Sequence, residues 1–222
     1  DVERSRGLGD VYKRQTQALQ NMAFDPLTML TITIALALAA SLYLAIEWQT
    51  VREPSLLYWS AGFALISVGC ILALLRSSGL LLVGIWFANG LLIISHWLFF
   101  AGVARFTETR LSPAWLLVVV IWFALLLLPE GPEWSKIMLL VNSLLIALIT
   151  IRASFLLRPR GKSLGAGAAQ LRFVLLGHGL FYIAKTIPVL MPGTLIDLAA
   201  FRGEIIQICL LYTSPSPRDL ST

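Results

Sequence analysis

Charged side chains are scarce in this chain of 222 residues, because Asp, Glu, Lys and Arg make up only 13% of it. Soluble proteins contain about 25% charged residues, so this shortage excludes an ordinary soluble domain. Apolar residues reach 58%, and several runs approach the ~20 residues that a helix needs to cross a ~30 Å hydrocarbon core. The composition predicts an all-α, polytopic integral membrane bundle whose main partner is the lipid bilayer.

The sequence also lacks the patterns that carry common chemistries. Its two cysteines, Cys70 and Cys209, do not suggest a disulfide framework. Zinc-ligand spacing, a phosphate-binding glycine loop and a nucleophile elbow are all missing. The net charge of +5 comes from basic residues in short loops and not from a continuous stripe, so a nucleic-acid partner is not expected. We therefore predict no catalytic residue, no metal, no cofactor and no enzymatic activity for this chain.

The two ends of the chain resemble translated sequencing-adapter DNA. One DNA sequence can encode Ser5–Gln15, and its complementary strand, in another frame, encodes Cys209–Arg218. We therefore expect residues 1–15 and 209–222 to be foreign to the protein and leave them out of the fold. The alternative is a natural basic tail at the start and a natural Pro/Ser-rich tail at the end. The native part then lies within residues 22–208, with Met22 as the expected start.

The apolar runs within residues 22–208 predict seven transmembrane helices, of which the last is cut short. Asp25 and Pro26 suit the N-cap and first position of the first helix. Gly177 and Gly179 are expected to let a neighbouring helix approach closely. The expected ranges are approximately 27–46, 57–75, 80–103, 114–128, 137–157, 171–190 and from 195 onward, with residues 161–170 as a linker.

Basic residues concentrate in the loop that contains Arg152, Arg158, Arg160 and Lys162. Lys and Arg in short loops stay on the cytoplasmic side of a membrane. We therefore expect these four residues to determine the topology. This orientation places the N-terminus outside and the C-terminus in the cytoplasm.

A few polar side chains fall within the predicted spans: Asn89 and His96 on the third, Asn142 on the fifth, and His178, Tyr182 and Lys185 on the sixth. Those on each helix share one face. Polar groups at this depth usually face the bundle interior, so Asn89, His96, His178, Tyr182 and Lys185 are candidates to contact a small-molecule ligand. The alternative is that they only bridge helices, at ~0.6 kcal/mol each. A metal or haem between the two histidines is a further alternative, although the sequence supplies no third ligand.

Four short segments carry a resemblance to a known family: Met22–Leu30, Tyr58–Phe63, Phe87–Leu92 and Phe100–Phe106. Together they resemble the N-terminal seven-helix membrane sensor region of bacterial GGDEF-class diguanylate cyclases. The resemblance implies a receptor of the bacterial inner membrane that works as a homodimer. Its cytoplasmic domain would bind GTP and Mg²⁺ and condense two GTP molecules to cyclic di-GMP. That domain, with its Gly-Gly-Asp-Glu-Phe signature, is absent from this chain.

The function expected from these patterns is that of a membrane signal-input domain belonging to a truncated receptor, most directly one with a cyclase output. The input domain of a membrane histidine kinase would have the same features. A small transporter or permease is the rival class. A membrane enzyme whose active residues lie beyond this sequence is the third alternative.

Overall fold

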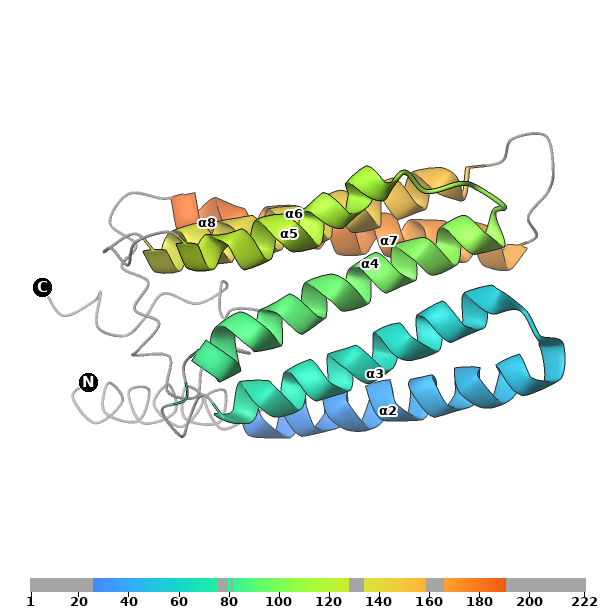
Figure 1. Ribbon diagram of the computed structural model, residues 1–222, viewed down its shortest axis with the longest axis horizontal. Coiled ribbons are helices and arrows are strands. Elements are labelled where there is room, and N and C mark those ends of the chain that lie inside the picture. Colours follow the sequence, from blue (N-terminus) through green and yellow to red (C-terminus); the bar gives the residue numbers. More distant parts are fainter. Residues whose placement is uncertain (1–25, 76–79, 81, 128–133, 159–165, 191–222) are drawn as a thin grey trace, which may run out of the picture.

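The computed structural model describes residues 26–75, 80, 82–127, 134–158 and 166–190, and the secondary structure within them is entirely helical. Figure 1 shows the helices lying roughly side by side along one long axis. The elements are α2 (Pro26–Val51), α3 (Pro54–Leu74), η2 (Leu82–Phe87), α4 (Ala88–Phe106), η3 (Pro113–Leu116), α5 (Leu117–Ala124), η4 (Leu125–Leu127), α6 (Trp134–Leu156), α7 (Ala166–Ala184) and α8 (Thr186–Leu190).

Four helical segments are long and apolar enough to cross a membrane: Leu30–Val51, Pro54–Leu74, Leu82–Phe106 and Lys136–Leu156. The third combines the π-helical η2 with α4, which continue one another. Pro113–Ala124 is also apolar but shorter, as the sequence predicted for the fourth run. The all-helical class and the membrane-spanning character of the helices therefore agree with the composition.

The helix count and several helix boundaries differ from the sequence prediction. The expected seventh helix, from 195 onward, lies outside the described residues, which form about six helical segments and do not support a count of seven. α2 continues to Val51 and not to 46, because no helix-breaking residue precedes Arg52. α7 begins at Ala166, within the expected linker, because its first residues are rich in alanine, the strongest helix former.

The bundle has two halves that meet at α4. In one half α2 packs against α3 and α3 packs against α4, while in the other α6 packs against α7. α4 also packs against α6 and thereby joins the halves. The core lies mainly along α4, α5 and α6, where Phe100, Trp122, Ile146 and Ile149 are almost fully buried.

A very short turn joins α2 to α3. Arg52 adopts a left-handed conformation with φ 58° and reverses the chain. Glu53 then caps α3, with its Oε1 accepting hydrogen bonds from Ser55 N at 3.5 Å and Ser55 Oγ at 3.3 Å, and Pro54 occupies the first turn. Inside the pair, Ser60 Oγ donates to the Ser41 carbonyl at 2.8 Å, so small polar residues let α2 and α3 approach closely.

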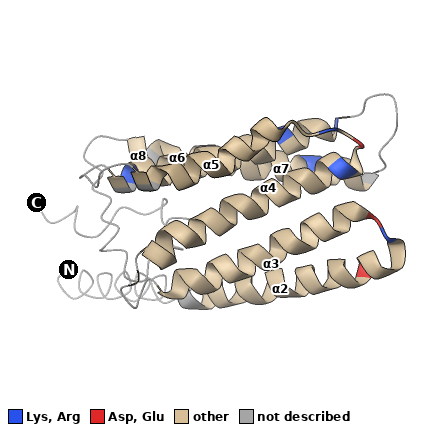
Figure 2. Cartoon of the chain, in the orientation of Figure 1, with Lys and Arg blue, Asp and Glu red and all other residues tan. Residues whose placement is uncertain are grey.

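Cations gather at one end of the bundle, as Figure 2 shows. Six of the eight described Lys and Arg residues belong to this end: Arg52, Arg105, Arg110, Arg152, Arg158 and Arg172. Lys136 and Lys185 belong to the opposite end. We call the first the cation-rich end. The described carboxylates Glu47, Glu53 and Glu108 share it, but the rule that orients membrane proteins counts Lys and Arg and gives acidic residues little weight.

Candidate functional site

His96 is the most deeply buried of the five candidate ligand residues. It lies in the middle of the span formed by η2 and α4 and is only 6% exposed. Its Nδ1 is 2.6 Å from the Leu92 carbonyl one turn earlier. A carbonyl oxygen can only accept a hydrogen bond, so His96 Nδ1 carries a proton and donates it to Leu92. The backbone of α4 thus sets the orientation of the ring.

His96 and His178 meet across the interface between the two halves of the bundle. Their Nε2 atoms are 3.1 Å apart. The ring planes differ by only 15° and the ring centroids are 5.3 Å apart. The centroids are farther apart than the nitrogens by nearly two ring radii, so the rings meet edge to edge in almost one plane. This is the geometry of a well-aligned hydrogen bond and not of face-to-face stacking.

The direction of the hydrogen bond between the two histidines follows from the bond that His96 donates to the Leu92 carbonyl. With Nδ1 of His96 protonated, its Nε2 accepts in the neutral ring, and His178 Nε2 therefore donates. Proton addition at Nδ1 of His178 preserves this donor and strengthens it by charge. Full protonation of both rings would instead set two N–H donors against each other. The pair therefore accommodates one extra proton but not two.

Tyr182 and Lys185 extend the site along α7. The Tyr182 ring lies 4.9 Å from the His178 ring and 6.1 Å from the His96 ring, measured between centroids. Lys185 Nζ lies 4.7 Å from the centroid of the Tyr182 ring, within cation–π range. His178, Tyr182 and Lys185, which the sequence places on one face of this helix, therefore contact one another in order along it.

Asn89 and Asn142 form a second polar contact, between α4 and α6. Asn142 Nδ2 donates to Asn89 Oδ1 at 3.3 Å, and Asn89 Nδ2 donates to the Ile85 carbonyl at 2.7 Å. Three buried oxygens of α4 and α6 have no hydrogen-bond partner within the described residues: Ser95 Oγ, Asn142 Oδ1 and Ser143 Oγ. Buried polar atoms are normally paired, so these groups are able to accept or donate to a bound molecule or water.

The polar groups form a strip that leads from mid-span toward one end of the bundle. Asn89 precedes His96 by seven residues and Lys185 follows His178 by seven, which is ~10 Å along a helix. Because α4 and α7 run in opposite directions (Figure 1), both offsets point to the end opposite the cation-rich end. The structure thus brings His96, His178 and Tyr182 together, with Lys185 and Asn89 farther along.

Part of this arrangement was not predicted from the sequence. Asn142 was noted as polar, but its contact with Asn89 was not predicted, and Ser95 and Ser143 were not singled out. The signal available was their position: polar residues inside apolar helices are conspicuous even when they are small. Of the topology residues, Arg152 and Arg158 lie at the cation-rich end, while Arg160 and Lys162 lie outside the described residues.

The site offers hydrogen-bond donors, acceptors and one cation, but few groups suited to metal binding. Within the described ranges, no three His, Cys, Asp or Glu side chains are grouped closely enough to hold a metal ion. Cys70 is a buried free thiol on α3. Comparison of the chain with protein-family models, with curated proteins and with solved structures gave no match. The chemistry of the site must therefore be judged from its own geometry.

Proposed function

We propose that this chain is a membrane signal-input domain in which the His96–His178 hydrogen bond reports the signal. That bond is the observation that carries the proposal. It links α4 to α7, and so one half of the bundle to the other, through two titratable rings, of which His96 is buried and His178 is exposed. A ligand or proton that changes the bond changes how the halves pack, which is the population shift that a sensor requires.

The position of the site favours a sensor over a transporter. A transporter needs a polar path from one membrane face to the other, usually through interrupted helices at mid-membrane. Here the polar strip runs from His96 toward one end, whereas nearly fully buried apolar side chains, including Phe100 and Val103, follow His96 on α4 toward the cation-rich end. This one-sided position suits reception of a signal better than passage of a solute.

The output in this proposal is a cytoplasmic diguanylate cyclase domain that this chain does not contain. The resemblance to sensor regions of the GGDEF class supports it. In such a receptor, GTP and Mg²⁺ would bind the absent domain, and the membrane part would act as a homodimer. The input domain of a histidine kinase remains the alternative within the same functional class, because only the output domain differs.

The proposed orientation places the cation-rich end in the cytoplasm of a bacterial inner membrane. The excess of six described cations over two supports it. Alkaline phosphatase, which is active only in the periplasm, is expected to be inactive when fused after Arg158 and active when fused after Leu127. Green fluorescent protein at the same positions serves as the reciprocal control. Active phosphatase after Arg158 would reverse the orientation and remove the route to a cytoplasmic output.

The functional test joins residues 22–208 to a diguanylate cyclase catalytic domain in cells without other cyclases. Replacement of His96 or His178 by phenylalanine removes the interhelical hydrogen bond. Such bonds contribute ~0.6 kcal/mol on average in membranes, so either variant is expected to change the ratio of the two signalling states about threefold. The measurement is the cellular level of cyclic di-GMP.

Phe173→Leu is the matched control, since this α7 side chain is 67% exposed and faces away from the packed interior. It is expected to leave cyclic di-GMP unchanged, and the variant that carries both histidine changes should not exceed the larger single effect. The sensor proposal fails if neither histidine variant alters the output. It also fails if the chain, purified into vesicles, carries solute across the membrane.

A further inference from the structure

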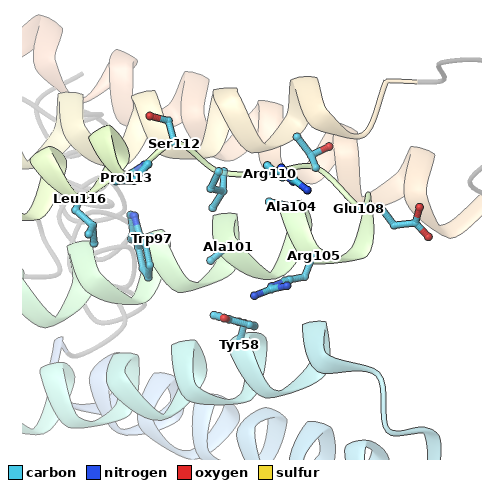
Figure 3. A pocket seen from close by; sticks show the side chains of 12 residues that line it. Tyr58, Trp97, Ala101, Ala104, Arg105, Glu108, Arg110, Ser112, Pro113 and Leu116 are labelled. Atoms are coloured by element: carbon cyan, nitrogen blue, oxygen red, sulfur yellow. The ribbon is translucent and has the colours of Figure 1, made fainter.

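A second site lies at the cation-rich end and is independent of the histidine pair. A cavity of about 730 Å³ opens there between α3, α4 and the segment 107–116 that leads into α5. Figure 3 shows its lining, in which Tyr58 comes from α3, Trp97 and Arg105 from α4, and Arg110 and Leu116 from the following segment. The cavity therefore combines two cations with aromatic and aliphatic walls.

The two guanidinium groups are available to an anion. Among the described residues, neither the Arg105 nor the Arg110 guanidinium makes an ion pair or hydrogen bond, and both side chains are exposed. Glu108 also borders the cavity, but its carboxylate points away from both arginines in Figure 3. At Glu108 the chain leaves α4 with φ 53°, and Thr109 N donates to the Ala104 carbonyl at 2.8 Å. The charge offered to a ligand is therefore predominantly positive.

The apolar side of the cavity distinguishes it from a simple anion site. Ala101, Ala104, Pro113 and Leu116 form walls beside Trp97. The Trp97 Nε1 donor is buried and has no partner within the described part of the chain. Tyr58 lies near the start of α3 and Arg105 near the end of α4. The cavity therefore lies at the ends of two helices of membrane-spanning length, where lipid headgroups are expected to meet acyl chains. Aromatic side chains favour that level.

We propose that this cavity binds the phosphate headgroup of an anionic phospholipid, with Arg105 and Arg110 contacting the phosphate and the apolar wall contacting the first part of the acyl chains. Basic pockets between helices at the cytoplasmic side are suited to anionic lipids. A soluble phosphate ester would satisfy the arginines equally well, but it would leave the apolar wall without a partner. A phospholipid would contact both the arginines and the apolar wall.

The test is binding of phosphatidylglycerol and phosphatidylcholine to the delipidated full chain in detergent, followed by native mass spectrometry. Phosphatidylglycerol is expected to bind in preference to phosphatidylcholine. Each basic side chain near an anionic lipid contributes about a fivefold factor to binding. The double variant Arg105→Gln/Arg110→Gln is therefore expected to bind phosphatidylglycerol about 25-fold more weakly and phosphatidylcholine unchanged.

The matched control is the double variant Arg152→Gln/Arg158→Gln, which removes the same charge from exposed positions at the same end but outside the cavity. It should retain the preference for phosphatidylglycerol. Equal losses in the two double variants would mean general attraction to the charged end and would overturn the proposal. Displacement of the lipid by inorganic phosphate alone would assign the site to a soluble ligand and would overturn it as well.

Discussion

Replacement of Trp122 by alanine is expected to lower the free energy of unfolding of the bundle by about 3–5 kcal/mol, the range for buried aromatic side chains. Trp122 is the largest fully buried side chain, with 1% of its surface exposed. Its Nε1 donates to the Trp86 carbonyl at 3.1 Å, and Gly90 leaves the space for its ring, because a Cβ there would lie 3.1 Å from Nε1. Alanine would therefore leave a cavity and remove this hydrogen bond between α5 and η2.

The effect should be local to the attachment of α5. This helix is only eight residues long, and its Leu117, Val120 and Ile121 side chains are largely exposed, so Trp122 supplies much of its packing. Val120→Ala is the control on the same helix and is expected to have little effect. Detergent-induced unfolding followed by circular dichroism measures both variants. Similar losses in the two would show that burial of Trp122 is not what holds α5.

Replacement of Gly179 by alanine is expected to destabilise the contact between α6 and α7 by about 1–3 kcal/mol through overpacking. A Cβ at this position would lie 2.5 Å from Ile151 Cγ1, 2.8 Å from Thr150 Oγ1 and 3.3 Å from the Ala147 carbonyl. The last contact is with backbone, which cannot rotate away. α7 would have to move off α6, and His178 would move with it, which would weaken the hydrogen bond to His96.

Gly177 provides an internal control two residues away. A Cβ at Gly177 would meet no atom within 4 Å, so the predicted close approach at this residue is wrong, although it is right at Gly179. Gly177→Ala is expected to be neutral or to stabilise α7 by up to ~1 kcal/mol through helix propensity. Unfolding midpoints of the two single variants measure the difference. Equal stability of the two would rule out a tight α6–α7 contact at Gly179.

The helices themselves were predictable because burial in lipid requires long apolar runs, and those runs are visible in the sequence. The ends of the helices were less predictable. The first helix was expected to end at 46, yet α2 continues through Glu47 to Val51, because a single charged residue does not break a helix. At the start of α7, the small residues from Ala166 suggested a flexible linker, yet alanine favours the helix. Hydropathy marks the apolar part of a helix and not its ends.

The candidate site was predictable within each helix but not between helices. Spacing placed His178, Tyr182 and Lys185 on one face of α7, and the ring contacts follow that spacing. The meeting of His96 with His178, across 82 positions of sequence, depends on which helices are neighbours, and hydrophobic periodicity does not encode that. The cavity beside Arg105 and Arg110 was not predicted because its lining comes from three separate elements, α3, α4 and the segment 107–116. The sensor function and the cyclase output stay predictions.

The arrangement of the helices around α4 has a mechanical consequence. α4 lies between two pairs of packed helices, α2 with α3 on one side and α6 with α7 on the other. Because α4 joins the two pairs, a rotation of α6 and α7 relative to α4 is expected to change the distance between His96 and His178 while the contact between α2 and α3 stays unchanged.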